Sequence, residues 1–318
     1  MHLPRFAHHQ AASVDDAVRL LGENPGARLL AGGTDLLVNM KHLVEQPEVL
    51  VSLAGVDGLR GVGEEQGATV IGARTTLKEV QQDAGLQAKF PALTKAAAAV
   101  GSYRHQTMGT LAGNLCQNTR CRFFNQPWQW RSARPLCYKA GGEFCHVRKK
   151  DGVCYSTYCG DVAPALLVLD AKVRVQGPDG RREIPLGDLF TGEGKHPLAL
   201  APAEMVTAVV LPEASANGRS TYEKHALRGS IDFPIVGTAV WRDESGMRVA
   251  YTAVDRRPVR ATELEAAMAG GALDEAAARE ASALATKAAT ITRTTVQPVP
   301  FKRELMATLF VRGVRALA

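Results

Sequence analysis

Apolar positions recur with the spacing of helices and strands over most of the chain, apart from one irregular stretch in the middle. In the first hundred residues the pattern predicts helices over 14–21, 36–43, 75–80 and 91–100. It predicts strands over 28–31 and 49–53, and a hairpin over 58–72 that ends in a strand over 69–72. Ser13 is a suitable cap for the first helix. This part of the chain is typical of small α/β units.

The second half predicts a similar alternation. A helix is expected over 161–169, and strands over 172–176 and 206–211. Residues 214–220 are expected to form a linker. Beyond it, the pattern predicts a smaller α+β unit, with strands over 220–227, 235–242 and 247–253 and helices over 264–268, 273–288 and 302–316.

The irregular stretch covers residues 114–160 and is rich in aromatic residues and arginine. It shows no clear period, and a loop of this length inside a compact protein is usually functional or disordered. All six cysteines of the chain lie within 44 positions of this region. Because intracellular proteins rarely use disulfides, such clustering favours metal binding over bridges. The remaining alternative is a set of buried free thiols.

Length and composition indicate an ordinary globular protein of two or three domains. The chain has 318 residues, 46% hydrophobic and 22% charged, with a net charge of +6. Basic residues are scattered apart from short runs at 148–150 and 256–257, so we expect no nucleic-acid partner. A basic face could instead dock an acidic electron carrier or a partner subunit.

The first residues and the apolar runs of the chain bear on its location in the cell. The first residues carry no apolar signal-like segment, and no run approaches the roughly 18 apolar residues that span a bilayer. We therefore expect a cytoplasmic protein that does not interact with membranes.

Two glycine-containing loops are candidates for binding a phosphorylated cofactor. The first covers 29–36, where a strand candidate is followed by Gly32, Gly33 and Thr34; the second covers 107–114 and again gathers small residues and hydroxyls. Glycines let the backbone approach an anion, and helix starts offer free N–H groups. Together the loops could clamp a pyrophosphate, although paired glycines alone usually mark plain turns.

Four of the cysteines have a spacing that suits a metal centre. From Cys121 the successive gaps are 16, 8 and 9 residues, to Cys137, Cys145 and Cys154. Four thiolates suit either a tetrahedral zinc ion or a 4Fe–4S cluster. The absence of close Cys-x-x-Cys pairs favours the cluster, but from the residues alone any four of the six cysteines could be ligands.

Asp161 follows this region directly and has two possible roles. It could cap the helix over 161–169, or it could accept hydrogen bonds from ribityl or ribose hydroxyls. The sequence alone favours capping.

Over essentially its full length the chain resembles the FAD-binding middle subunit of the xanthine dehydrogenase and carbon monoxide dehydrogenase group. The resemblance rests on the segments 31–35 and 110–114, on Gly160-Asp161 and on Lys224. It implies an α+β fold with a two-lobed FAD-binding domain of the vanillyl-alcohol-oxidase type over 1–213, with lobes of roughly 1–57 and 58–213. A cysteine-rich cluster-binding insert is implied at about 115–160, and a small C-terminal α+β domain over 214–318.

The resemblance also implies the residues that contact the flavin cofactor. Transferred to this sequence, they are Leu29, Leu30, Ala31, Gly32, Gly33, Thr34, Asp35, Leu36, Val100, Thr110, Leu111, Ala112, Gly113, Asn114, Arg122, Asp161 and Lys224.

The cysteine-rich segment is similar to that of the beta subunit of 4-hydroxybenzoyl-CoA reductase. Residues 114–121, 124–126 and 160–166 carry this similarity. It implies a 4Fe–4S cluster with Cys121, Cys137, Cys145 and Cys154 as ligands, and it leaves Cys116 and Cys159 out. A cysteine at 159 departs from the expected pattern.

The function implied by the resemblance is electron transfer. A ferredoxin-like carrier would exchange electrons with the cluster and FAD, which connect to a small subunit with two 2Fe–2S clusters and a large molybdopterin subunit. The main expectation is reductive dehydroxylation of 4-hydroxybenzoyl-CoA or a related aromatic acyl-CoA. One alternative is an oxidative molybdenum hydroxylase or aldehyde dehydrogenase, and another is a zinc-binding interaction module. No catalytic residue is expected on this chain.

Overall fold

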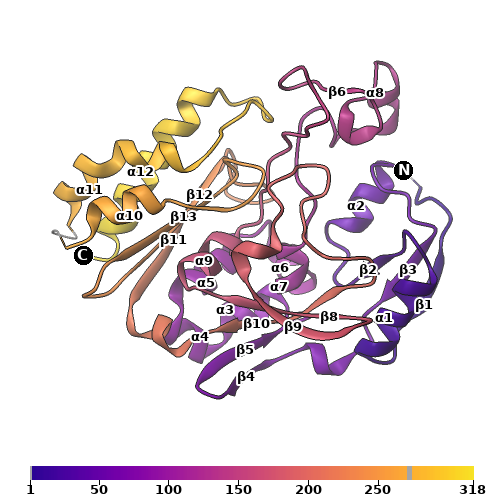
Figure 1. Cartoon of the computed structure of the whole chain (residues 1–318), viewed down its shortest axis with the longest axis horizontal. Helices are drawn as coiled ribbons and strands as arrows, with labels where there is room; N and C mark the ends of the chain where they lie inside the picture. Colours follow the sequence, from indigo (N-terminus) through magenta and orange to yellow (C-terminus); the bar gives the residue numbers. More distant parts are fainter. Residues whose placement is uncertain (1, 271–273) are drawn as a thin grey trace.

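The computed structural model describes residues 2–270 and 274–318 and has the mixed α/β architecture that the sequence predicts (Figure 1). A parallel sheet of order β1-β3-β2 comes first, formed by β1 (Ala7–Gln10), β2 (Arg28–Leu30) and β3 (Val49–Ser52). Its connections are the helices α1 (Val14–Glu23) and α2 (Leu36–Lys41). Ser13 caps α1 by accepting a hydrogen bond from the Asp16 amide, as predicted.

A five-stranded antiparallel sheet follows, in the order β4-β5-β10-β8-β9. Its strands are β4 (Val62–Glu65), β5 (Ala68–Gly72), β8 (Lys172–Gly177), β9 (Gly180–Pro185) and β10 (Met205–Leu211). Every residue of the central strand β10 is buried, which explains its uninterrupted apolar sequence. The strands β5 and β8 are neighbours of β10, so roughly a hundred residues of chain leave the sheet between them and return.

A layer of helices built by these residues covers the sheet. It contains α3 (Leu77–Gln82), α4 (Ala84–Lys89), α5 (Pro91–Ala98), α6 (Tyr103–Met108), α7 (Leu111–Leu115) and α9 (Val162–Val168). All seven residues of α9 are buried. The main hydrophobic core includes this layer, the sheet beneath it and Tyr222, Ala239, Trp241 and Ala250 from the last sheet.

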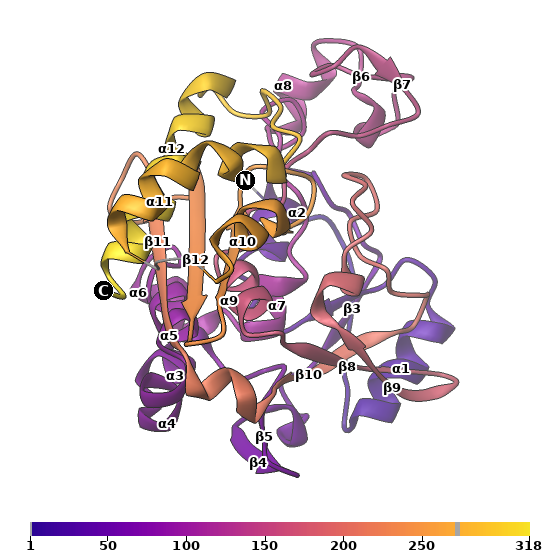
Figure 2. The ribbon, with the colours of Figure 1, turned by 60° about the vertical axis from the view of Figure 1, so that its left-hand side comes forward.

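The last sheet is antiparallel, in the order β11-β12-β13-β14. It consists of β11 (Arg219–His225), β12 (Val236–Arg242), β13 (Met247–Thr252) and β14 (Val259–Arg260). Its far face packs against α10 (Thr262–Met268), α11 (Glu275–Ala281) and α12 (Val299–Arg315), which Figure 2 shows in front of the strands. The sheet is therefore a middle layer with a separate apolar core on each side.

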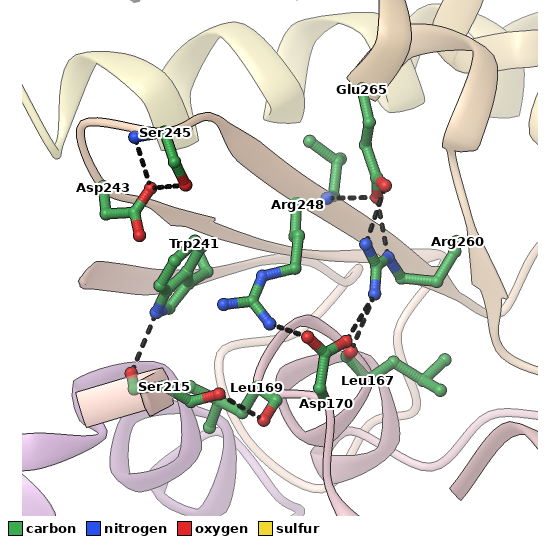
Figure 3. Close-up of polar contacts among 11 residues, drawn as sticks. Leu167, Leu169, Asp170, Ser215, Trp241, Asp243, Ser245, Arg248, Arg260 and Glu265 are labelled. Atoms are coloured by element: carbon green, nitrogen blue, oxygen red, sulfur yellow. Dashed lines mark hydrogen bonds and ion pairs between the residues drawn. The ribbon is translucent and has the colours of Figure 1, made fainter. Parts of the chain in front are cut away.

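A group of polar contacts fastens α9 to this sheet (Figure 3). Arg260 donates hydrogen bonds to the Leu167 carbonyl at 3.2 Å and to Asp170 at 3.0 Å, and it also pairs with Glu265 at 2.7 Å. Arg248 forms a second ion pair with Asp170. The end of α9 is thereby held at a fixed place against β13 and β14.

The cysteine-rich segment, residues 115–160, projects from the main body in both views (Figures 1 and 2). Its regular elements are short: α8 (Trp128–Ser132), the 3₁₀ helix η2 (Tyr138–Ala140), β6 (Phe144–Cys145) and β7 (Lys150–Asp151). Its own core consists of Cys121, Phe124 and Cys137 with a few half-buried neighbours. The prediction of an irregular region agrees with this structure.

Some predicted elements differ from the structure. The helix expected over 273–288 is two elements, α11 and the 3₁₀ helix η5 (Ser282–Ala288), while residue 273 lies outside the described residues. The expected linker over 214–220 is the 3₁₀ helix η4 (Glu213–Asn217) followed by the start of β11. Ser215 in η4 is buried because its hydroxyl donates to the Leu169 carbonyl at 2.6 Å.

Among the described residues, five strands were not predicted: β1, β6, β7, β9 and β14. The exposure of β1 and β9 removes the apolar alternation on which a strand prediction depends. In the described part of the chain, no helix has the length and apolar content that crossing a membrane requires.

Candidate flavin and metal sites

The two glycine-containing loops, far apart in sequence, pack backbone against backbone. A Cβ atom placed on Gly32 would lie 1.8 Å from the Met108 carbonyl oxygen, so no other residue fits there. A Cβ on Gly109 would lie 3.3 Å from the Thr34 hydroxyl. Gly33 adopts a positive φ of 68°, which also favours glycine. Glycine therefore brings the loops together.

A cavity of about 150 Å³ lies at this junction. It is lined by residues from both loops, from the start of α9 and from the segment after β11. They are Thr34, Asp35, Leu77, Val100, Gly101, His105, Gly109, Thr110, Gly113, Asn114, Gln117, Asp161, Ile231, Asp232 and Phe233.

Asp161 is a buried carboxylate on the wall of this cavity, held by two partners from β11. Tyr222 donates a hydrogen bond to it at 2.8 Å, and the Lys224 ammonium lies 3.1 Å away. Burial raises the pKa of Asp161 to about 6, against the opposing influence of Lys224 and Tyr222. Lys224 also donates to the carbonyls of Ala99 and Asp232, at 2.8 and 3.0 Å. The network joins the helix layer to the last sheet.

The expectation that Asp161 caps α9 is wrong. Its side chain makes no capping hydrogen bond. The Val162 amide at the helix start donates instead to the Asn114 side chain, at 3.1 Å. Pairing with Lys224 and Tyr222, which are about sixty residues away in sequence, takes the carboxylate away from the helix end.

The predicted flavin-contacting residues fall into three groups: those that line the cavity or pair with a residue that does, those in the same loops that do not line it, and Arg122. Thr34, Asp35, Val100, Thr110, Gly113, Asn114 and Asp161 line the cavity, and Lys224 pairs with Asp161. A second group lies in the same loops but does not line the cavity: Leu29, Leu30, Ala31, Gly32, Gly33, Leu36, Leu111 and Ala112. Leu111 is fully buried in the main core.

Arg122 does not line the cavity. Its guanidinium lies over the Phe123 ring at 4.8 Å, and its amide donates to the Thr294 carbonyl at 2.8 Å. The arginine that reaches the first loop is Arg120, which forms an ion pair with Asp35. The two arginines are separated by one cysteine, and a contact of Arg122 with the flavin stays a prediction.

Several lining residues were not predicted. The most informative are Ile231 and Phe233, whose side chains are 58% and 45% exposed. The Ile231 amide donates to the Gly101 carbonyl at 2.8 Å, which holds this segment at the cavity. Large apolar residues between two strand candidates were the available signal, because a plain turn has no need of them.

A second, smaller cavity lies within the cysteine-rich segment. The four predicted ligands Cys121, Cys137, Cys145 and Cys154 all line it, together with Phe123, Phe124, Tyr138, Lys139, His146, Val147 and Ser156. Over the residues that the structure describes, no three His, Cys, Asp or Glu side chains gather tightly enough to hold a single metal ion.

Cys116 and Cys159 do not line this cavity. Cys116 packs against the main core, and burial raises its pKa to about 12. Cys159 is buried and donates to the Thr157 carbonyl at 3.5 Å, and burial raises its pKa to about 11. Both are protonated thiols near neutral pH, held by the body of the protein.

The two cavities are close neighbours along the chain. Gln117 lines the first and Cys121 lines the second. Four residues of extended chain span at most about 14 Å, so the Cα atoms of these two residues cannot be farther apart.

Comparison with known families identifies the class of protein. Residues 4–214 match the family described as the FAD binding domain in molybdopterin dehydrogenase, and residues 220–317 match the CO dehydrogenase flavoprotein C-terminal domain. The chain therefore belongs to the FAD-binding medium subunits of molybdenum hydroxylases of the xanthine dehydrogenase and CO dehydrogenase type.

Individual relatives agree with this assignment. The chain is 34% identical to the aldehyde oxidoreductase FAD-binding subunit PaoB of Escherichia coli K12, over 84% of this chain and 87% of that protein. It is 30% identical to the carbon monoxide dehydrogenase medium chain of Afipia carboxidovorans, over 88% and 85%. The structure of reconstituted CO dehydrogenase from Oligotropha carboxidovorans superposes with a TM-score of 0.82 at 25% identity, covering 100% of both chains.

These comparisons confirm the family and the oxidoreductase class that the sequence predicts. The closer relation to 4-hydroxybenzoyl-CoA reductase stays a prediction.

Proposed function

We propose that FAD binds in the larger cavity, held by the two packed loops and by Asp161. The support is the close approach that Gly32 and Gly109 allow, together with the hydroxyls of Thr34 and Thr110 on the cavity wall. Backbone N–H groups of these loops suit a pyrophosphate, and the buried Asp161 carboxylate suits sugar or ribityl hydroxyls. When bound, the flavin supplies the ability to exchange electrons, and the protein supplies position and electrostatics.

We further propose that Cys121, Cys137, Cys145 and Cys154 hold a 4Fe–4S cluster. Their sharing of one cavity supports this, as does the placing of Cys116 and Cys159 elsewhere. Four thiolates are the usual ligand set for such a cluster. A zinc ion would need all four sulfurs about 2.3 Å from one point. The wide spacing of the four cysteines along the chain, without close Cys-x-x-Cys pairs, favours the cluster over zinc.

The function that these sites support best is electron transfer within a molybdenum enzyme that oxidises its substrate. Relatives of the chain are named aldehyde oxidoreductase, xanthine dehydrogenase and carbon monoxide dehydrogenase subunits. The single observation that carries the proposal is the pair of adjacent cavities, one suited to FAD and one lined by four cysteines. Electrons would enter from a small 2Fe–2S subunit and a large molybdopterin subunit, and would leave through this chain.

The charge distribution supports an acidic electron carrier as the partner of the cysteine-rich segment. Residues 115–160 contain eight Lys and Arg against two Asp and Glu, out of 38 and 32 in the whole chain. The other 272 residues therefore hold 30 of each, and the whole net charge of +6 lies in this segment. Such a concentration steers an oppositely charged protein, for example one of the ferredoxin type.

The second candidate is reductive dehydroxylation of an aromatic acyl-CoA. It rests on the similarity of the cysteine-rich segment to that of 4-hydroxybenzoyl-CoA reductase. The substrate would bind on the large subunit in either case, so only an assay of the assembled complex separates the two directions.

The experiment is to purify the complex and assay both directions. We expect aldehydes or N-heterocycles to reduce the flavin, and reduction of 4-hydroxybenzoyl-CoA by a low-potential donor to be absent. Turnover of the thioester alone would replace the oxidative proposal by the reductive one. Zinc without flavin on this chain would refute both and favour an interaction module.

A further inference from the structure

Lys139 occupies an unusual position in the cysteine-rich segment. It follows Cys137 by two residues, lies in η2 and lines the same cavity as the four cysteines. Its ammonium is surrounded by uncharged oxygen atoms, from Asn118 at 2.6 Å, the Gly194 carbonyl at 2.7 Å, the Thr119 carbonyl at 3.3 Å, the Ser156 hydroxyl at 3.4 Å and the Thr119 hydroxyl. The Phe124 ring centre lies 4.8 Å away.

None of these partners carries a negative charge. Among the described residues, no Asp or Glu oxygen pairs directly with the Lys139 ammonium; the Glu45 carboxylate lies one hydrogen bond further out, where it accepts from the Asn118 side chain at 3.0 Å. Enclosing a cation among neutral groups is costly unless an anion lies close by. A group with four thiolate ligands is such an anion, and it becomes more negative with each electron that it gains.

The ammonium also lies close to a candidate ligand. The Ser156 hydroxyl is 3.4 Å from Lys139 Nζ and 3.0 Å from Cys154 Sγ, so the nitrogen and the sulfur are at most about 6.4 Å apart. At such a distance in a partly buried site, two charges interact much more strongly than they would at the surface.

We propose that Lys139 is the buried counter-ion of a 4Fe–4S cluster in this cavity, and that its positive charge raises the cluster's reduction potential. This rests on the proposed function. The cluster takes up one electron from a reductant such as dithionite, and no bond to the lysine forms or breaks. Lys139 acts on the cluster through its charge alone. It is therefore a positioning residue and does not itself carry electrons.

The test compares Lys139→Gln, Lys139→Arg and Lys150→Gln in the purified full-length chain. Lys150 belongs to the same segment but is exposed and does not line the cavity, so its removal changes the net charge equally while solvent screens the effect. Iron and acid-labile sulfide are counted first. The cluster is then titrated with dithionite and followed by EPR.

We expect Lys139→Gln to shift the equilibrium toward the oxidised cluster by tenfold or more, which is about 59 mV to lower potential for one electron. Lys139→Arg and Lys150→Gln should stay close to the wild type. Loss of iron in Lys139→Gln but not in Lys139→Arg would also support the proposal.

Two outcomes would overturn it. One is a Lys139→Gln protein with full iron content and the wild-type potential. The other is loss of iron in both Lys139 variants, which would mean that the shape of lysine is needed and not its charge. A wild-type chain without iron would refute the proposed cluster itself, and would be recognised before any variant is compared.

Discussion

The two cavities are built in different ways. The flavin cavity lies against the main core, with a fully buried α9 on one side and two tightly packed glycine loops on the other. The cysteine cavity lies in a projecting segment whose elements are two to five residues long and whose core is little more than Cys121, Phe124 and Cys137. The difference shows that hydrophobic burial shapes the first site, whereas the second has little apolar surface to order it.

A segment with so small a core would draw much of its stability from the proposed cluster, because ligand binding is then also folding energy. Removing the cluster should therefore destabilise the cysteine-rich segment and leave the flavin cavity intact.

Cys137→Ser should abolish the cluster while FAD stays bound. The flavin cavity does not include Cys137, and the serine hydroxyl is a poor ligand for iron. Iron analysis should show nearly complete loss, and the flavin absorbance should be unchanged. As matched controls, Cys116→Ser and Cys159→Ala should retain their iron. Retained iron in Cys137→Ser, with iron lost in a control, would mean that the ligand set is different.

Gly33→Val should strongly impair FAD binding. The residue has a positive φ, and a Cβ would lie 2.9 Å from the Leu37 side chain, so the loop must move. The cost is of the order of 2 kcal/mol or more, which is about thirtyfold in affinity. Gly58→Ala, whose Cβ would meet open space, is the control. The FAD content of the purified variants measures the effect; normal flavin in Gly33→Val would count against the loop assignment.

The network around Asp161 predicts a pH dependence for the FAD-free chain. The folded-state pKa of about 6 lies above the ordinary value of 3.8, so the folded protein binds the proton more tightly than the unfolded one. The stabilisation is therefore present below about pH 4 and is lost as pH rises through about 6, by about 3 kcal/mol in total.

Urea unfolding of the wild type and of Asp161→Asn between pH 4 and 7 tests this. Asparagine can still accept the hydrogen bond of Tyr222 but does not titrate. We expect the variant to lose the fall in unfolding free energy between pH 4 and 6. An equal fall in both proteins would place the titrating group elsewhere.

Asp170→Asn should have the smallest effect, because Asp170 is half exposed and its ion pairs with Arg248 and Arg260 are partly screened (Figure 3). The expected loss is about 1 kcal/mol in unfolding free energy, with both cofactors retained. Thermal unfolding of the holo-protein measures it. Loss of FAD in this variant would mean that the ion pairs between the end of α9 and the last sheet also affect FAD binding in the cavity.

Burial pattern decided which parts of the fold could be predicted from the sequence. The strand β10 was predictable because both its faces are covered and its residues are uniformly apolar. The strands β1 and β9 lie at sheet edges and are exposed, so nothing in their residue types distinguishes them from loops.

The sites were predictable in part for a similar reason. Glycine pairs and clustered cysteines are visible locally, but partners far apart in sequence are not. The pairing of Asp161 with Tyr222 and Lys224 depends on the packing of α9 against the last sheet. Likewise, spacing could not distinguish the cysteines lining the cavity from Cys116 and Cys159, since only the fold turns these two toward the body of the protein.

We propose that one chain holds both FAD and a 4Fe–4S cluster. The content of FAD, iron and acid-labile sulfide in the purified full-length chain tests this. We expect one FAD with about four irons and four sulfides per chain, the composition of a single Cys₄-held cluster. FAD with no iron, or with one zinc in its place, would contradict it.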